Sequence, residues 1–169
     1  MKEDYDIIKL NKKAWDNAAK IYDQEFHGKV YTLFKFFCVN LAKGGYILDL
    51  GSGTGLPYSK LLIEKGFKVL GIDLSPEMIK IARKNVPLAK FKEMSMTDLN
   101  YKDDFDGIFS SYSMLLLNPL LFKGTAKRIV QALKKRGIFY LCLNGPWIEG
   151  VNLDNDVIIE FKGEKMYSR

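Results

Sequence analysis

Apolar residues follow two different patterns along the chain, and the pattern changes near residue 45. Before it, apolar side chains keep roughly helical spacing from Tyr5 to about Phe26, and a second helical stretch runs from about Lys29 to Leu41. Gly44-Gly45 then predicts a helix stop. Beyond it, short apolar runs alternate with helical stretches, which predicts strands at residues 46–50, 67–73, 88–94, 105–111 and 138–143. The helices predicted between them are residues 56–65, 76–84 and 123–135, the last one ended by Gly137.

Strands that alternate with helices form βαβ units, whose strands lie parallel in one sheet. Such a sheet is covered on both faces, so its inner strands are nearly continuous apolar runs, as residues 139–143 are. The sequence therefore predicts an α/β fold, a doubly wound Rossmann-like sheet that is mostly parallel and has helices on both faces. Residues 157–161 and 165–167 predict a hairpin, so the C-terminal antiparallel edge of the sheet is expected to be incomplete. A partner that covers this edge is expected, and a second copy of the chain is the candidate.

The composition narrows the class of protein. Hydrophobic residues make up 47% and charged residues 27% of the 169 residues, which is enough apolar material for one folded core. The formal charge of +6 permits a polyanionic partner, but the basic residues are scattered, which favours an ordinary solvated surface over nucleic-acid binding. Cys38 and Cys142 lie far apart in apolar runs, so no disulfide or metal site is expected. The charged N-terminus and the lack of a long apolar stretch predict a cytoplasmic protein with no membrane partner.

The candidate chemistry centres on a glycine-rich turn after the first predicted strand. Asp49-Leu50-Gly51-Ser52-Gly53-Thr54-Gly55 lies at the carboxyl end of that strand, where open α/β sheets bind ligands. Glycines permit positive φ and let a ligand approach the backbone closely. Asp49 is expected at the end of its strand rather than in the core, and Asp73 ends the next strand. In nucleotide-binding folds of this type, an acid at the second position hydrogen-bonds the hydroxyls of a ribose.

The spacing of the glycines discriminates between ligands. A dinucleotide site has the pattern GxGxxG, and the free amides of its turn receive a pyrophosphate. Here the pattern is GxGxG with Leu56 at the sixth position, and the acidic residue immediately upstream repels a phosphate. That carboxylate suits a cation, such as the ammonium group of a methionine moiety. The residues therefore favour an adenosine ligand with a positively charged tail.

Several segments resemble one enzyme family. Residues 47–55 resemble the first motif of the class I S-adenosylmethionine-dependent methyltransferases, and residues 71–78 resemble the segment that follows it in small-molecule-type members. Residues 105–109 and 133–139 resemble the fourth strand and the approach to the fifth. The resemblance covers about residues 10–145. It implies S-adenosylmethionine as the cofactor, S-adenosylhomocysteine as the product and methyl transfer as the reaction.

The resemblance also implies a set of cofactor-binding residues. The glycines of the turn would hold the methionine and ribose part, and Asp73 would hold the ribose hydroxyls. Leu74 and Met78 would pack on the adenine, and Asp49 would orient the amino-acid end. The whole implied set is Tyr22, Asp49, Gly51, Ser52, Gly53, Gly55, Asp73, Leu74, Met78, Ser95, Met96 and Ser110.

Trp15 and Tyr22 match an N-terminal element that closes over the cofactor in such enzymes, although an aromatic stripe that packs a helix on the sheet is an equal alternative. The chain is thus predicted to be a single domain. Residues 1–43 would form a helical lid, residues 44–144 the Rossmann-like core, and residues 145–169 an edge hairpin or a tail.

The chain departs from the family on the adenine side. Ser95 stands where many relatives carry an acidic residue that accepts a hydrogen bond from the adenine amino group, so lower affinity is expected. Asp98 would substitute for that acid, or it is a turn-forming residue, which is the commoner role of Asp there.

No motif assigns a catalytic base or an acceptor. His27, the single histidine, and Tyr112 are the candidates for a base. Ser110-Ser111-Tyr112-Ser113 stands where methylases of nucleobase amino groups carry Asp/Asn-Pro-Pro-Tyr/Phe, and no Pro-Cys dipeptide supplies a nucleophile for cytosine. A small-molecule acceptor is therefore predicted, with protein or RNA as the next choices. A non-catalytic S-adenosylmethionine-binding protein and a nicotinamide-dependent oxidoreductase are the competing hypotheses, and the GxGxG spacing argues against the latter.

Overall fold

The computed structural model describes residues 2–25, 32–143, 157–161 and 164–168, with side chains described for residues 7–24 and 33–143. One sheet of five parallel strands has the order β3-β2-β1-β4-β5. Its strands are β1 Tyr46–Leu50, β2 Lys68–Asp73, β3 Lys90–Glu93, β4 Phe105–Ser111 and β5 Leu133–Cys142. This topology confirms the predicted Rossmann-like α/β fold.

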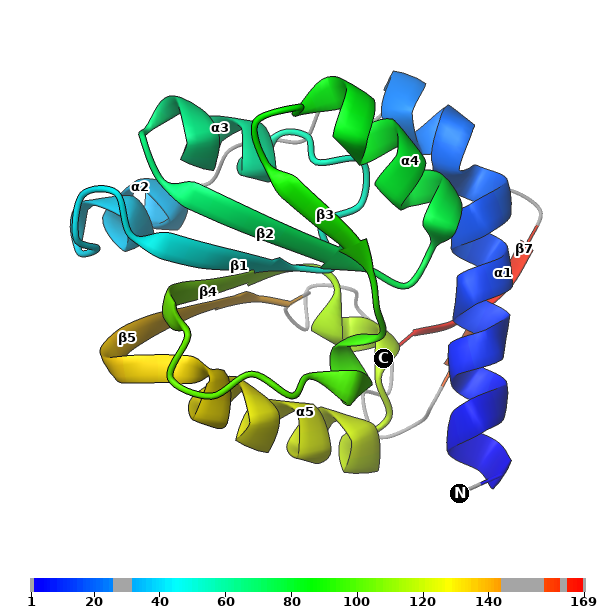
Figure 1. Ribbon diagram of the computed structural model, residues 1–169. Coiled ribbons are helices and arrows are strands. Elements are labelled where there is room, and N and C mark those ends of the chain that lie inside the picture. The colour runs from blue at the N-terminus through cyan, green and yellow to red at the C-terminus, as the bar shows by residue number, and fades with distance from the viewer. Residues whose placement is uncertain (1, 26–31, 144–156, 162–163, 169) are drawn as a thin grey trace.

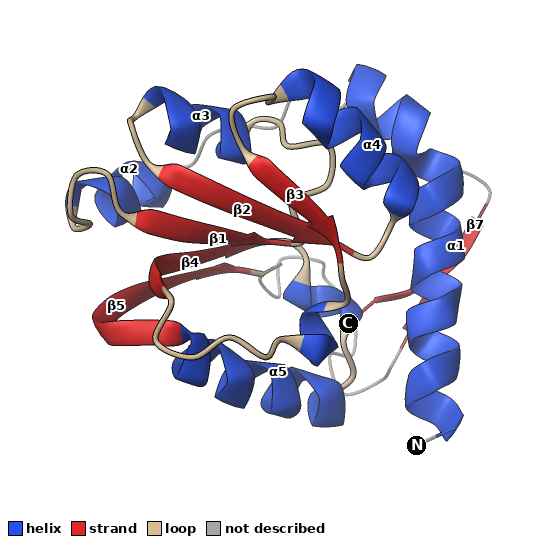
Figure 2. Ribbon diagram, in the orientation of Figure 1, coloured by secondary structure: helices blue, strands red, loops and turns tan. Residues whose placement is uncertain are grey.

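Helices cover both faces of this sheet and one of its ends. The helices are α1 Lys2–Glu25, α2 Thr32–Val39, α3 Tyr58–Glu64, α4 Pro76–Asn85 and α5 Pro119–Ala132, with the 3-10 turns η1 Met96–Asp98 and η2 Met114–Leu116. Helices α2, α3 and α4 lie on one face and α5 lies on the other, whereas α1 runs across the carboxyl ends of the strands (Figures 1 and 2). Ligands of open α/β sheets bind at this carboxyl edge, so α1 stands over the expected site.

The alternation of side chains along β1 explains how the core is divided. Leu48 and Leu50 are fully buried in the cluster on the α5 face. Ile47 points to the opposite face, where it packs in the cluster that α2 and α3 cover. Because successive side chains of a strand point to opposite faces, Asp49 shares the face of Ile47.

Capping residues set the start of the two longest helices that follow strands. Ser75 Oγ accepts a hydrogen bond from Met78 N at 3.1 Å, and Pro76 occupies the first position of α4, so this helix begins at the predicted residue 76. The prediction that the next helix begins near Lys123 is wrong. Asn118 Oδ1 accepts from Leu121 N at 2.9 Å, so α5 begins four residues earlier, at Pro119.

The end of α5 also differs from the prediction. Gly137 does not stop a helix, because α5 ends at Ala132 and residues Leu133–Cys142 form β5. Leu133 pairs with Phe105, and the register with β4 shifts before Gly107 pairs with Ile138. The basic residues 134–136 therefore belong to a strand at the edge of the five-stranded sheet, not to a helix end.

The predicted C-terminal hairpin forms, but it does not extend the main sheet. Strands β6 (Val157–Phe161) and β7 (Glu164–Ser168) pair antiparallel as a separate two-stranded sheet. Strand β7 packs against α1 rather than beside β5 (Figure 1). A partner that covers β5 therefore stays a prediction. None of the described helices is long and apolar enough to cross a membrane.

Candidate cofactor-binding site

The glycine-rich turn joins β1 to the segment before α3 and is fixed to the end of β2. Gly51, Gly53 and Gly55 have φ values of +78°, +53° and +78°, which L side chains rarely adopt. Gly51 N and Ser52 N both donate to the Ile72 carbonyl oxygen at 2.9 Å. A Cβ on Gly51 would lie 2.3 Å from Ser113 Cβ, so the turn requires glycine there.

Asp73 closes β2 beside this turn. Its Oδ2 accepts from Gly53 N at 2.9 Å, and its Oδ1 accepts from Ser75 N at 2.9 Å. Burial raises the pKa of Asp73, while these backbone N–H groups oppose the rise and the charge of Asp16 adds to it. A carboxylate has about four lone-pair directions, so both oxygens retain capacity for further donors such as hydroxyl groups.

Asp49 lies inside β1, which corrects the expectation that it stands clear of the core. The residue is 4% exposed, and Ser59 Oγ of α3 donates to its Oδ2 at 2.5 Å. Its strand position turns the side chain to the face under α3, which explains the burial. Burial raises the pKa of Asp49 to about 7; the Ser59 hydrogen bond lowers it, and the charge of Asp73 raises it further.

These two carboxyl groups lack a cationic side chain among the described residues. Lys12, Lys80 and Lys134 form their ion pairs with Asp16, Glu77, Glu93 and Asp106 instead. Carboxylates that are removed from water without a counter-charge are costly, and a positively charged ligand offsets that cost. The donor and acceptor set beside the turn thus fits a ligand with ribose hydroxyls and a cationic tail.

Tyr22 of α1 lies over the glycine turn. Its Cε1 would be 3.8 Å from a Cβ on Gly53, the nearest heavy atom in that direction. Burial raises the pKa of Tyr22, and the charges of Asp73 and Asp49 raise it further, so its hydroxyl shares the surroundings of both carboxyl groups. Trp15 packs edge-on against its ring at a centroid distance of 5.5 Å. The Tyr22 ring therefore lies at the glycine turn, and its closing over a cofactor stays a prediction.

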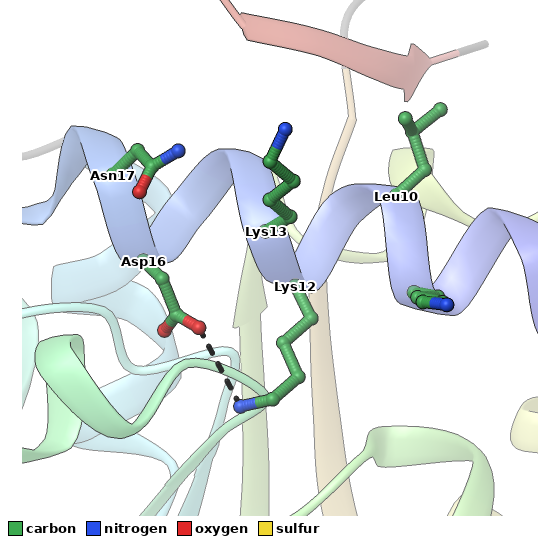
Figure 3. Close-up of a pocket in the computed structure, with 6 residues that line it drawn as sticks. Leu10, Lys12, Lys13, Asp16 and Asn17 are labelled. Carbon is green, nitrogen blue, oxygen red and sulfur yellow. Dashed lines mark ion pairs between the residues drawn. The ribbon is translucent and has the colours of Figure 1, made fainter.

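Polar contacts tie α1 to the ends of β2 and β3. Lys12 Nζ donates to the Leu74 carbonyl oxygen at 3.2 Å and to Glu93 Oε1 at 3.1 Å. Ser75 Oγ donates to Asp16 Oδ1 at 2.5 Å. Lys12 and Asp16 form an ion pair at 3.6 Å and point to the same side of α1 (Figure 3).

The cavity that Figure 3 shows has a volume of about 510 Å³ and is lined by Lys9, Leu10, Lys12, Lys13, Asp16 and Asn17.

The residues expected around the adenine are split between the surface and the core. Ser95 Oγ caps η1 by accepting from Thr97 N at 3.3 Å. Met96 Cε would be 3.6 Å from a Cβ on Gly51, which places this side chain at the turn. Met78 is 1% exposed and thus part of the core, whereas Leu74 is partly buried. Asp98 is exposed in the last position of η1 and accepts from Thr97 Oγ1 at 3.4 Å.

The rim after β4 holds the remaining candidates. Ser110 is fully buried, and its hydroxyl lies 2.8 Å from that of Ser113. Tyr112 is 37% exposed and has a φ of +56°, which is uncommon for a residue other than glycine. His27 lies outside the described residues.

The contacts of four site residues were not predicted from the sequence, although Ser113 belongs to the predicted rim segment 110–113 and Ser75 precedes the helix predicted at residue 76. Ser59 and Ser75 hold the carboxyl groups of Asp49 and Asp16, Ser113 Oγ donates to the Leu50 carbonyl oxygen at 2.6 Å, and Asn85 contacts the turn. The N-cap position of Ser75 has a local sequence signal, but its hydrogen bond to Asp16 of α1 has none. The other contacts join segments with no common pattern in the sequence.

Comparisons with known proteins agree with this geometry. A model of the Methyltransferase domain family matches residues 47–137. The methyltransferase-named protein YqeM of Bacillus subtilis (strain 168) is 35% identical over 131 residues, covering 73% of this chain and 53% of the relative. The chain spans about half the length of the curated relatives that it matches. The chain belongs to the Methyltransferase domain family.

Solved structures extend the comparison to the fold and the cofactor. The TehB-like SAM-dependent methyltransferase of Corynebacterium glutamicum superposes with a TM-score of 0.64 at 27% identity, covering 76% of this chain and 73% of the other. Magnesium protoporphyrin IX methyltransferase of Synechocystis, solved with bound SAM, shares the fold with a TM-score of 0.62 at 14% identity, over 72% and 69% of the two chains. The family match and the SAM-dependent neighbour at 27% identity support S-adenosylmethionine as the cofactor over a nicotinamide dinucleotide.

Proposed function

We propose that this chain transfers the methyl group of S-adenosylmethionine to a small-molecule acceptor. The observation that carries the proposal is a pair of carboxyl groups, the buried Asp49 and the partly buried Asp73, that flank a positive-φ glycine turn beneath Tyr22. A pocket that required only a particular shape would gain nothing from two carboxyl groups without a cationic partner, because removing their charges from water opposes folding.

The residues would divide the cofactor among them. Asp73 would accept from the ribose hydroxyls, and the main chain of residues 51–55 would contact the ribose and methionine part. Asp49 would attract the ammonium end through the turn, and Leu74 and Met96 would border the adenine. Residues 1–43 would then act as the lid on a core of residues 44–144, with Tyr22 closing over the cofactor.

Methyl transfer requires little of the protein beyond placing the acceptor and the methyl donor correctly. When bound, S-adenosylmethionine supplies a methyl group on a positively charged sulfur, which is already a strong electrophile. The chain's task is to align an acceptor lone pair behind that methyl group and to exclude water. Tyr112, exposed at the carboxyl end of β4, is our candidate contact to the acceptor.

Calorimetric titration tests the cofactor part of the proposal. Intact protein is titrated with S-adenosylmethionine and with S-adenosylhomocysteine, beside Asp73→Ala and the control Asp103→Ala, an exposed acid on a loop. We expect binding by the intact chain and by the control, and loss of at least tenfold in affinity for Asp73→Ala, since two hydrogen bonds to a charged group disappear. Equal affinity of Asp73→Ala and the control contradicts the assigned site.

A second experiment tests the acceptor class. Protein and S-adenosylmethionine are incubated with a cell extract that has been divided by ultrafiltration, and release of S-adenosylhomocysteine is measured. Release with the small-molecule filtrate supports the proposal. Release that needs the retained macromolecules, and that ribonuclease or protease abolishes, points to RNA or protein instead. Cofactor binding with no release from either fraction favours the non-catalytic binding protein.

A further inference from the structure

Asn85, the last residue of α4, joins the glycine turn to α1. Its Nδ2 donates to the Thr54 carbonyl oxygen at 3.0 Å and to Asp23 Oδ1 at 2.8 Å. A carboxamide nitrogen carries two hydrogens, so one nitrogen serves both acceptors. Thr54 lies 31 residues before Asn85 and Asp23 lies 62 residues before it, so the side chain connects three separate segments.

Both acceptors are next to residues that face each other across the site. Thr54 stands between Gly53 and Gly55 in the turn, and Asp23 follows Tyr22 in α1. We call Gly53 the floor and Tyr22 the roof of the cofactor site; Tyr22 Cε1 would be 3.8 Å from a Cβ on Gly53, so the ring lies directly on the turn. The Nδ2 atom of Asn85 therefore binds both Thr54, which is next to the floor, and Asp23, which is next to the roof.

Helix α4 also supports the floor by packing. A Cβ on Gly55 would lie 3.1 Å from Val86 Cγ2 and 3.5 Å from Ala82 Cβ, so the turn rests directly on the end of α4. The glycine turn is thus held by apolar contact with the end of α4 and by the hydrogen bond from Asn85 to Thr54. Helix α1 packs through its buried Ala14, Ala18 and Ala19, and the hydrogen bond from Asn85 to Asp23 adds to this packing next to Tyr22.

We propose that Asn85 is a positioning residue for the cofactor, which fixes where the Tyr22 ring lies against the glycine turn at Gly53. The inference rests on the proposed function, because it requires that the cofactor contact the turn and the Tyr22 ring beside the point where the two meet. Without Asn85 the protein still folds, since α4 keeps its apolar contacts and its capped start. The substitution removes the fixed position of Tyr22. The cofactor must then order the Tyr22 side chain when it binds, and this entropic cost weakens binding.

The test compares variants that remove one or both hydrogen bonds. Asn85→Ala removes both, Asp23→Ala removes the bond to α1, and Asp23→Asn keeps an acceptor oxygen there. Asn40→Ala is the matched control, because it removes a carboxamide that donates to the Phe36 carbonyl oxygen at 2.7 Å on α2. Each full-length variant is titrated calorimetrically with S-adenosylmethionine, and its thermal unfolding is recorded without ligand.

We expect Asn85→Ala to raise Kd about tenfold and Asp23→Ala about threefold, the size of two and one ordinary hydrogen bonds. Asp23→Asn and Asn40→Ala stay within about twofold of the intact chain. A double-mutant cycle adds a readout that a merely structural role does not move. Tyr22→Ala raises Kd in the intact chain but adds little in the Asn85→Ala background, where the roof is already displaced.

Two results overturn the inference. If Asn85→Ala keeps the Kd of the intact chain and only its unfolding temperature falls, Asn85 stabilises the fold and positions nothing. If the effects of Tyr22→Ala and Asn85→Ala add fully, Asn85 does not act through the roof. In both cases the intact chain still binds S-adenosylmethionine, and the proposed function stands. If the intact chain binds no S-adenosylmethionine, the proposed function and this inference fall together.

Discussion

Replacing Asp49 by Asn tests whether the charge of a buried carboxyl group opposes folding. The residue is 4% exposed and accepts a hydrogen bond from Ser59 Oγ at 2.5 Å. An Asn at this position keeps an acceptor oxygen for Ser59 and nearly the same shape, but carries no charge. The substitution therefore removes the electrostatic term and leaves the packing nearly unchanged.

The magnitude follows from the pKa of Asp49. Burial raises this pKa from 3.8 to about 7, against the Ser59 hydrogen bond and with the charge of Asp73. Because the folded-state pKa lies above the unfolded value, the folded protein binds more protons between about pH 4 and pH 7, and its stability falls as the pH rises through that range. A shift of this size corresponds to about 4 kcal/mol of lost stability above the folded pKa.

The assay is urea unfolding of both proteins without ligand at about pH 5 and about pH 8, at one ionic strength. We expect the stability of Asp49→Asn relative to the intact chain to increase by about 2–3 kcal/mol between these two pH values. Other titrating groups are common to both proteins and largely cancel in the difference. A difference that does not change with pH would refute the reasoning, because Asp49 would then have the same pKa in the folded and unfolded chain.

Three further substitutions test the packing around the site by urea unfolding. Gly51→Ala should lower the free energy of unfolding by about 3 kcal/mol, since the φ of Gly51 is +78° and the new Cβ would lie 2.3 Å from a side-chain atom. The control is Gly124→Ala in α5, where the space around the new Cβ is open, and it should raise the free energy of unfolding by about 0.5–1 kcal/mol. A loss of stability in this control would contradict a helix at Gly124. Phe109→Ala should cost about 3–5 kcal/mol, because the ring is fully buried and stacks on Tyr140 at 4.5 Å; a cost under about 1 kcal/mol would mean that this cluster is not packed as described. Asn118→Ala should cost about 1 kcal/mol by removing the N-cap of α5, and no change would place the start of the helix elsewhere.

The fold was predictable because its signals are local. Strands β1, β2 and β4 and the second half of β5 appear in the sequence as apolar runs, and β1 and β4 have the predicted bounds. The error at α5 is also local in origin: Asn118-Pro119 is an N-cap signal, but the apolar residues after it do not have a clear helical pattern. The end of α5 was not predictable in this way, because residues 134–136 have no apolar pattern and become a strand only through pairing with β4.

The site was predictable only where its residues belong to one motif. Gly51, Gly53 and Asp73 lie where the glycine pattern and the strand ends predict. The burial of Asp49 was missed because an acid next to a glycine turn looks like a strand end, whereas the alternation of β1 turns it under α3. The partner of its carboxylate, Ser59, lies on the next helix and has no distinguishing sequence signal.

The contacts of α1 show why a lid helix is the hardest part to predict. Lys12, Asp16 and Asp23 contact residues that lie 59 to 81 positions away, either between the end of β2 and the end of α4 or at the end of β3. Nothing in the helical spacing of α1 distinguishes these residues from solvated charges on an exposed face. The segment that follows β2 therefore holds both the glycine turn and α1, and Asn85 of α4 contacts both through Thr54 and Asp23.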